Sequence, residues 1–227
     1  MRPALPAAAL LAATFAVTAT AQTPTAGEKA VMTEIVRLDG KADVDEKLAA
    51  AARVVAEFET GTDALLAKLA KHPEVGGVKL QDATKCTDKG FAVLKELPNL
   101  RKLVLGKATL TPASAAAIGQ CKNLRYLGLV GCGVTDAEFA GMKDLTMLEH
   151  LALSENPQIT DKTMAVVKGY SRLRVLYLNK TGITDKGLAE LKPLDGLRTL
   201  SVKATRVTAD AADKFVDEMP NLRSVGQ

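Results

Sequence analysis

The sequence has few of the side chains on which catalysis, metal binding and nucleic-acid recognition usually depend. It contains no tryptophan, its aromatic content is 4%, and only two histidines and three cysteines occur among 227 residues. It has no metal-ligand spacing, no phosphate-binding glycine loop and no G-x-S-x-G nucleophile motif. We therefore predict that the protein is not an enzyme and has no catalytic residues, no metal site and no cofactor.

Charge and long apolar runs are also scarce. The formal net charge is only +4 at pH 7, and no basic cluster is interleaved with aromatics, so nucleic acid is not an expected partner. Beyond the first residues, no apolar run is long enough to cross a bilayer.

The first 21 residues have the composition of a secretory signal peptide. Arg2 precedes an almost wholly apolar stretch at residues 4–17, and the Ala-Thr-Ala of residues 19–21 matches an A-x-A cleavage site. The apolar stretch is too short for a membrane anchor, and no cysteine for lipid attachment lies nearby. We predict a signal peptide over residues 1–21 and a soluble mature chain from Gln22, secreted or periplasmic in a bacterium, without membrane insertion.

The most frequent feature of the sequence is a motif that recurs about every 24 residues. Its leading leucine is followed three residues later, and again two residues after that, by an aliphatic residue, which is a strand-like alternation. A threonine then precedes a stretch with apolar residues three apart, as on one helix face. The leading leucines, at steps of 24 or 25 residues, are Leu100, Leu124, Leu148, Leu173, Leu197 and Leu222. Each unit predicts a strand, a turn and a helix, and the units must stack to bury both apolar faces.

The clearest copy, at residues 172–195, has the sequence RLRVLYLNKTGITDKGLAELKPLD. Residues 54–227 resemble the leucine-rich repeat family, and the I/V-T-D-x-G-L segment is similar to its cysteine-containing subtype, found beside F-boxes and in secreted bacterial proteins. The resemblance implies an α/β solenoid with a parallel β-sheet on the concave face, helices on the convex face, and protein or peptide binding by the concave strands. The subtype's cysteine/asparagine position is filled only by Cys132 and Asn156, which predicts an interrupted ladder of turn hydrogen bonds.

Both ends depart from the repeat. Residues 22–53 predict a polar tail and a helix that caps the first repeat. Residues 221–227 begin one more strand, whose edge we expect to be exposed. This edge supports an alternative function, a structural component of the cell envelope that assembles through the edges of the solenoid or through this strand.

Three recurrent side-chain patterns each allow two interpretations. The Thr-Asp pairs could form a calcium ladder, but helix capping by threonine with an acid in the first turn is favoured. Arginines after the leading leucines could attract an acidic ligand, although a solvated edge is favoured. The cysteines are interpreted as small buried apolar residues, with a disulfide between Cys121 and Cys132 as the alternative.

Alternation within each strand predicts the side chains that face outward on the concave surface. Small residues lie at its centre, two tyrosines and a histidine border them, and no acid occurs at the outward positions. Aromatic side chains often carry most of the energy of an interface. The predicted partner-binding residues are Tyr126, His150, Tyr177, Val104, Lys102, Lys79 and Lys203. We expect one monomer to bind a protein or peptide, with the lysines favouring an acidic rim on that partner; the alternative is a concave face that binds nothing.

Overall fold

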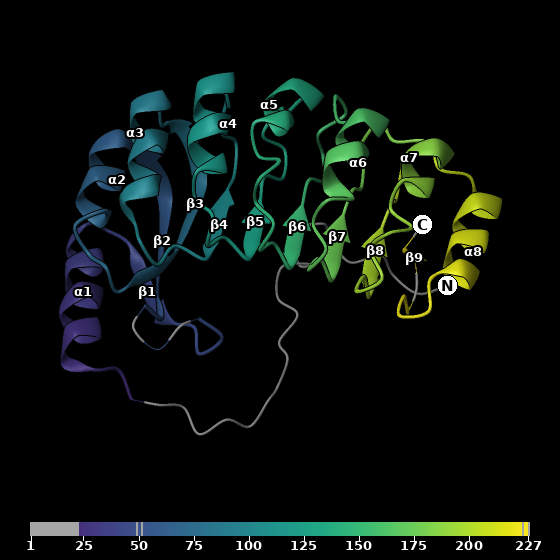
Figure 1. The fold of residues 1–227 in the computed structure, drawn as a ribbon. Coiled ribbons are helices and arrows are strands. Elements are labelled where there is room, and N and C mark those ends of the chain that lie inside the picture. Colours follow the sequence, from purple (N-terminus) through teal and green to yellow (C-terminus); the bar gives the residue numbers. More distant parts are fainter. Residues whose placement is uncertain (1–22, 49, 51, 224, 227) are drawn as a thin grey trace, which may run out of the picture.

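The computed structural model describes residues 23–48, 50, 52–223 and 225–226. They form an arc in which the strands line the inner side and the helices the outer side (Figure 1). The strands of the described residues make one sheet, ordered as they follow in the chain from β1 to β9. The predicted signal peptide lies outside the described residues.

The sheet and helix bounds follow the repeat. The strands are β1 Lys41–Val44, β2 Val54–Thr62, β3 Val75–Lys85, β4 Lys102–Leu105, β5 Tyr126–Gly128, β6 His150–Ala152, β7 Val175–Tyr177, β8 Thr199–Ser201 and β9 Val225–Gly226. The helices are α1 Ala26–Arg37, α2 Asp63–Leu69, α3 Asp88–Val93, α4 Pro112–Gly119, α5 Asp136–Ala140, α6 Asp161–Val167, α7 Asp185–Ala189 and α8 Ala209–Glu218. A 3-10 turn, η2 at Leu94–Glu96, continues α3.

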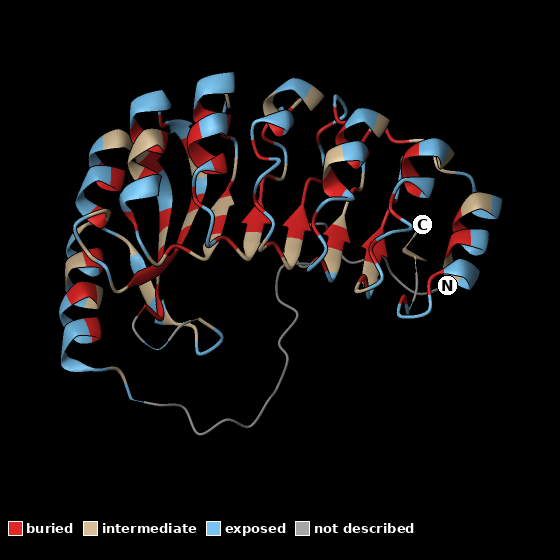
Figure 2. Ribbon diagram, in the orientation of Figure 1, coloured by how far each residue is buried: buried red, intermediate tan, exposed pale blue. Residues whose placement is uncertain are grey.

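The predicted α/β solenoid with a parallel concave sheet is confirmed. From β2 to β9 every neighbouring pair of strands is parallel. The two aliphatic residues of each strand point between sheet and helices, as Leu103 (0% exposed) and Leu105 (1% exposed) show. Figure 2 shows buried residues in red along the strands and on parts of the helices throughout the arc. Neighbouring repeats thus share one continuous core.

The N-terminal end contains a feature that the sequence did not predict. After α1, the strand β1 pairs antiparallel with β2, through Lys41 opposite Glu57 and Val44 opposite Val54. The buried pair of Arg53 and Glu28 holds α1 against the start of β2, with Arg53 Nε donating to Glu28 Oε1 at 2.9 Å. The end of the solenoid is therefore covered by a helix and a β-hairpin together.

The repeated threonines cap the helices as predicted, and the acids that follow them also bind the next repeat. Thr87, Thr160 and their equivalents accept hydrogen bonds from the first-turn amides. The Asp136 carboxylate, at the start of α5, accepts from the Thr160 N–H at 2.8 Å and the Thr160 hydroxyl at 2.6 Å in the next repeat. Asp63, Asp161 and Asp185 bind the next threonine in the same way. The acids therefore join neighbouring repeats in addition to complementing the helix dipole.

The ladder of turn hydrogen bonds is less interrupted than predicted. Asn156 bridges two repeats, and the Cys132 thiol lies 3.2 Å from the Leu105 carbonyl oxygen of the preceding repeat. The Thr181 hydroxyl donates to the Leu178 carbonyl at 2.7 Å, within its own repeat. Threonine therefore replaces the local bond of the cysteine/asparagine position but not the bond between repeats.

All three cysteines lie within the described residues and are buried free thiols. Burial raises the pKa of Cys86 to about 11, that of Cys121 to about 12 and that of Cys132 to about 11. The interpretation as small buried apolar residues is confirmed, and the alternative Cys121–Cys132 disulfide is not formed.

Candidate binding surface on the concave face

The strand register places the predicted aromatic residues side by side on the concave face. Tyr126 of β5 is opposite His150 of β6, and Tyr177 of β7 is opposite Ala152 of β6. The strands lie along the inside of the arc in Figure 1, with β5, β6 and β7 near its middle. The structure therefore brings the three residues onto adjacent strands around Gly128 and Ala152, which are both buried.

Tyr126 and His150 form a stacked pair. Their ring centroids are 5.6 Å apart with an interplanar angle of 19°, and Lys102 Nζ lies 5.6 Å from the centroid of the Tyr126 ring. A cation at this distance stabilises the aromatic face and restricts its motion. The pair is consequently a preorganised, half-buried ledge, since both residues retain intermediate exposure.

The ledge is uncharged at neutral pH. Burial, with a further contribution from nearby Tyr177, raises the pKa of Tyr126, so its hydroxyl stays protonated. Burial also lowers the pKa of His150, opposed by Glu149 and reinforced by Lys47, Lys102 and Arg174. The two side chains can thus offer apolar ring surface together with a hydroxyl and an imidazole for hydrogen bonds.

Two of the predicted lysines are neutralised by acids from the N-terminal end. Lys102 Nζ lies 3.1 Å from Asp45 Oδ2, in the segment after β1. Lys79 Nζ lies 3.0 Å from Glu57 Oε1 of β2, which also accepts from Gln81 Nε2 at 2.8 Å. The repeats have no acid at outward concave positions, but the capping hairpin supplies Asp45 and β2 supplies Glu57. The surface near β3 and β4 is therefore less positive than the repeats alone indicate.

The last predicted lysine borders a polar network that sequence reasoning missed. The Asn179 side-chain oxygen accepts from the Ser201 hydroxyl at 2.7 Å and from the Lys203 N–H at 2.8 Å. The Asn179 N–H donates to the Ser154 hydroxyl at 3.2 Å. Within the described residues the Lys203 ammonium has no ion-pair partner. The small polar residues at these outward positions are the sequence signal that could have revealed the network.

Val104 belongs to this surface, whereas the arginine row does not contribute to it. Val104 of β4 borders the small centre, being opposite Gly128 of β5. In the arginine row, Arg125 Nη1 pairs with Glu149 Oε1 at 2.6 Å. The described residues hold no group of three or more potential metal ligands, and no helix among them is long and apolar enough to span a bilayer.

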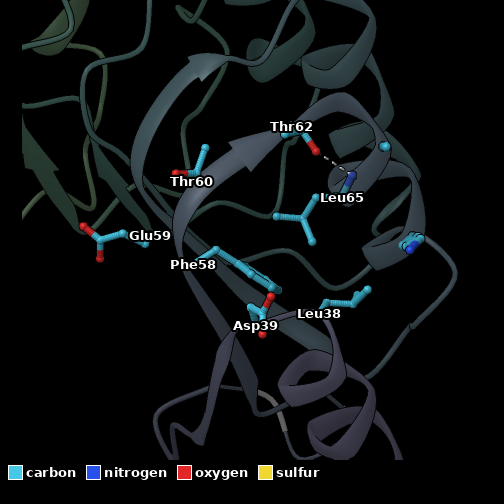
Figure 3. A pocket seen from close by; sticks show the side chains of 9 residues that line it. Leu38, Asp39, Phe58, Glu59, Thr60, Thr62 and Leu65 are labelled. Atoms are coloured by element: carbon cyan, nitrogen blue, oxygen red, sulfur yellow. Dashed lines mark hydrogen bonds between the residues drawn. The ribbon is translucent and has the colours of Figure 1, made fainter.

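A hollow in the described part of the chain lies elsewhere. It has a volume of about 420 Å³ and lies between β2, α2 and the turn after α1 (Figure 3). None of the predicted partner-binding residues lines it. This hollow is therefore separate from the predicted partner-binding surface.

The comparison with family models agrees with the repeat pattern over one unit. Residues 172–192, within the clearest copy of the motif, match a family model described as a leucine rich repeat. The comparison with curated proteins finds no match. Among solved structures, the chain is similar to an internalin C2 from Listeria monocytogenes, with a TM-score of 0.47 and 21% sequence identity over 76% of this chain and 77% of that chain.

Proposed function

We propose that the protein is an exported, non-enzymatic binding module that recognises a protein or peptide through its concave strands. One observation carries the proposal: the stacked Tyr126–His150 pair and Tyr177 lie on consecutive strands around a floor of small residues. Rigid aromatic side chains beside small residues supply large contact areas at low entropic cost, and such residues dominate many interfaces.

The contacts on this surface favour a partner with an apolar or aromatic anchor. Gly128 and Ala152 are buried, and Val104 and Tyr126 pack over Gly128, so these neighbouring side chains form the contact surface. Tyr126 and Tyr177 keep only part of their rings exposed, and this exposed part is the area that each can bury against a partner. Because Lys79 and Lys102 already have acidic partners, an acidic group on the partner would pair mainly with Lys203.

The proposed location outside the cytoplasm rests on the composition of residues 1–21. Burial of the thiols supports it, because a protonated, buried thiol resists the oxidation and disulfide exchange that exported proteins encounter. The I/V-T-D-x-G-L motif supports assignment to the cysteine-containing subtype of the leucine-rich repeats, with threonine supplying only the local turn bond in the later repeats.

The test is a pull-down from bacterial envelope and culture-supernatant extracts, with the purified protein as bait. The concave variant combines Tyr126→Ala, His150→Ala and Tyr177→Ala. The control variant changes three exposed residues on the convex side, Lys143→Ala, Lys162→Ala and Lys186→Ala. Circular dichroism must show equal folding of all three proteins before binding is compared.

A partner retained by the unmodified and control proteins but lost by the concave variant would support the proposal and identify that partner. Equal retention by all three proteins would overturn the concave site. Recovery of only the bait's own copies would instead favour the alternative function, a structural envelope component that assembles through the solenoid edges.

A further inference from the structure

The hollow at the N-terminal end has an apolar floor and a polar rim. Phe58 and Leu65 are almost fully buried, and Leu38 packs against the same core. In Figure 3 the ring of Phe58 points toward Leu38 and Asp39, while Leu65 lies on the opposite side below Thr62. The Leu65 N–H donates to the Thr62 hydroxyl at 3.2 Å, which fixes this side of the hollow at the start of α2. The cavity is thus bounded by rigid elements.

One wall of the hollow is an unpaired strand edge. β1 pairs with β2 only along Val54–Glu57, although β2 continues to Thr62. The Asp45 N–H donates to the Arg53 carbonyl at 2.9 Å, whereas the Val54 N–H donates toward the β3 side, to Glu74. Alternate residues of a strand direct their backbone groups to the same side. Glu59, which is exposed and lines the hollow, therefore directs its backbone groups to the side where β1 has ended and no strand of the described residues follows.

The rim of the hollow carries carboxylates without partners. Neither Asp39 nor Glu59 forms an ion pair or side-chain hydrogen bond with any described residue, although carboxylates elsewhere on β2 and β3 do, as Glu57 and Asp82 show. Figure 3 shows the Glu59 carboxylate directed away from Phe58, on the other face of the strand. Lys68 of α2, which has no ion pair with a described residue, places a cation on the far rim. The rim is thus negative beside β2, at Asp39 and Glu59, and positive beside α2.

We propose that this edge of β2 is a docking site for an extended basic peptide segment of a partner protein, which adds as a strand beside Glu59. Strand addition satisfies unpaired backbone groups, and alternate side chains of the added strand supply specificity. Here one set of side chains would enter the apolar hollow over Phe58 and Leu65. The other set would face the Glu59 carboxylate. The chemistry therefore selects a segment that alternates apolar and cationic residues.

A pair of alanines on α2 provides matched variants for a test. Both are exposed, but Ala64 lines the hollow and Ala67 does not. Ala64→Trp should fill the hollow, and Ala67→Trp should add the same side chain outside it. The probe is a fluorescein-labelled heptapeptide that alternates valine and lysine, and the control peptide carries glutamate in place of lysine. Binding of each peptide to the purified protein is measured by fluorescence anisotropy.

We expect saturable binding of the lysine peptide, weakened about tenfold or more by Ala64→Trp and hardly changed by Ala67→Trp. Asp39→Asn combined with Glu59→Gln should weaken binding and reduce its dependence on salt, because surface charges are screened by ions. Equal effects of the two tryptophan variants, or equal binding of the glutamate peptide, would overturn the proposal. Self-association that Ala64→Trp abolishes would also overturn it, in favour of a second copy of the chain.

This site is separate from the concave surface. The variant lacking Tyr126, His150 and Tyr177 should therefore bind the lysine peptide with unchanged affinity. Failure of one proposal in its own assay leaves the other standing.

Discussion

Replacement of Asn156 by alanine should lower the free energy of unfolding by about 3 kcal/mol, at about 1 kcal/mol for each buried backbone group left without its hydrogen bond. Asn156 is 0% exposed. Its side-chain oxygen accepts from the Val134 N–H at 3.0 Å, and its amide donates to the carbonyls of Leu129 at 2.7 Å and Leu153 at 2.8 Å. The first two of these groups belong to the preceding repeat. The change would therefore remove a connection between repeats as well as a local turn bond.

The estimate depends on the burial of the groups that would be orphaned. Leu129 and Leu153 are 0% exposed and Val134 is 1% exposed, so water cannot readily replace the lost partner. The Ser154 carbonyl, a fourth neighbour of the amide, keeps its bond from the Gly131 N–H at 3.0 Å and adds little. For a chain of this size the loss corresponds to a decrease in Tm of roughly 6–12 °C.

Asn123→Ala is the matched control. Asn123 is exposed, and its amide makes one hydrogen bond, to the Pro98 carbonyl at 3.0 Å. We expect this change to cost less than about 1 kcal/mol. Urea denaturation followed by circular dichroism gives both values, provided that the m-value is unchanged. An Asn156→Ala protein as stable as the Asn123→Ala protein would refute the reasoning that the buried amide joins the repeats.

Two further predictions concern carboxylates. Asp136→Ala should destabilise the protein by roughly 2 kcal/mol more than Asp88→Ala, because Asp136 accepts three hydrogen bonds from the next repeat and Asp88 accepts one. Urea denaturation measures both variants. Equal denaturation midpoints would contradict the conclusion that these acids join neighbouring repeats. The second prediction concerns the stability of the fold in acid. Hydrogen bonds from Arg53 and from the Thr25 N–H lower the pKa of Glu28 from 4.5 to about 2. Its contribution is complete above about pH 4.5 and is lost as the pH falls toward 2, since the unfolded chain takes up the proton first. Glu28→Gln should therefore lower Tm more at pH 7 than at pH 3, and an equal decrease at both values would show that the ionised pair does not stabilise the fold.

Much of the architecture could be predicted because each repeat makes the same contacts at a constant sequence separation. The spacing of the leading leucines placed Tyr126 opposite His150 without any structure, since one residue per strand occupies each position of a parallel ladder. Helix capping by Thr87 and its equivalents followed from local geometry alone. The burial of the cysteines followed from their apolar positions in the repeat.

Other features escaped prediction because they involve contacts outside the repeat. The short strand β1 has only four residues and no strong apolar alternation. Its sequence therefore does not predict the antiparallel pairing with β2. The bond between Asp136 and Thr160 joins residues 24 apart, and an acid at the start of a helix has a sufficient local explanation in the helix dipole. A local explanation thus concealed a contact between repeats.

By itself, the sequence determined the period, the direction of each side chain in a strand and hence the rows of the concave face, since stacking of equal units leaves little freedom in their register. Only the tertiary structure decided the charge and the accessibility of those rows. The Asp45–Lys102 ion pair joins residues 57 positions apart, and the hollow beside Glu59 exists because β1 ends before β2 does. Such contacts depend on how a unique N-terminal segment folds back onto the periodic one, and no repeat encodes that geometry.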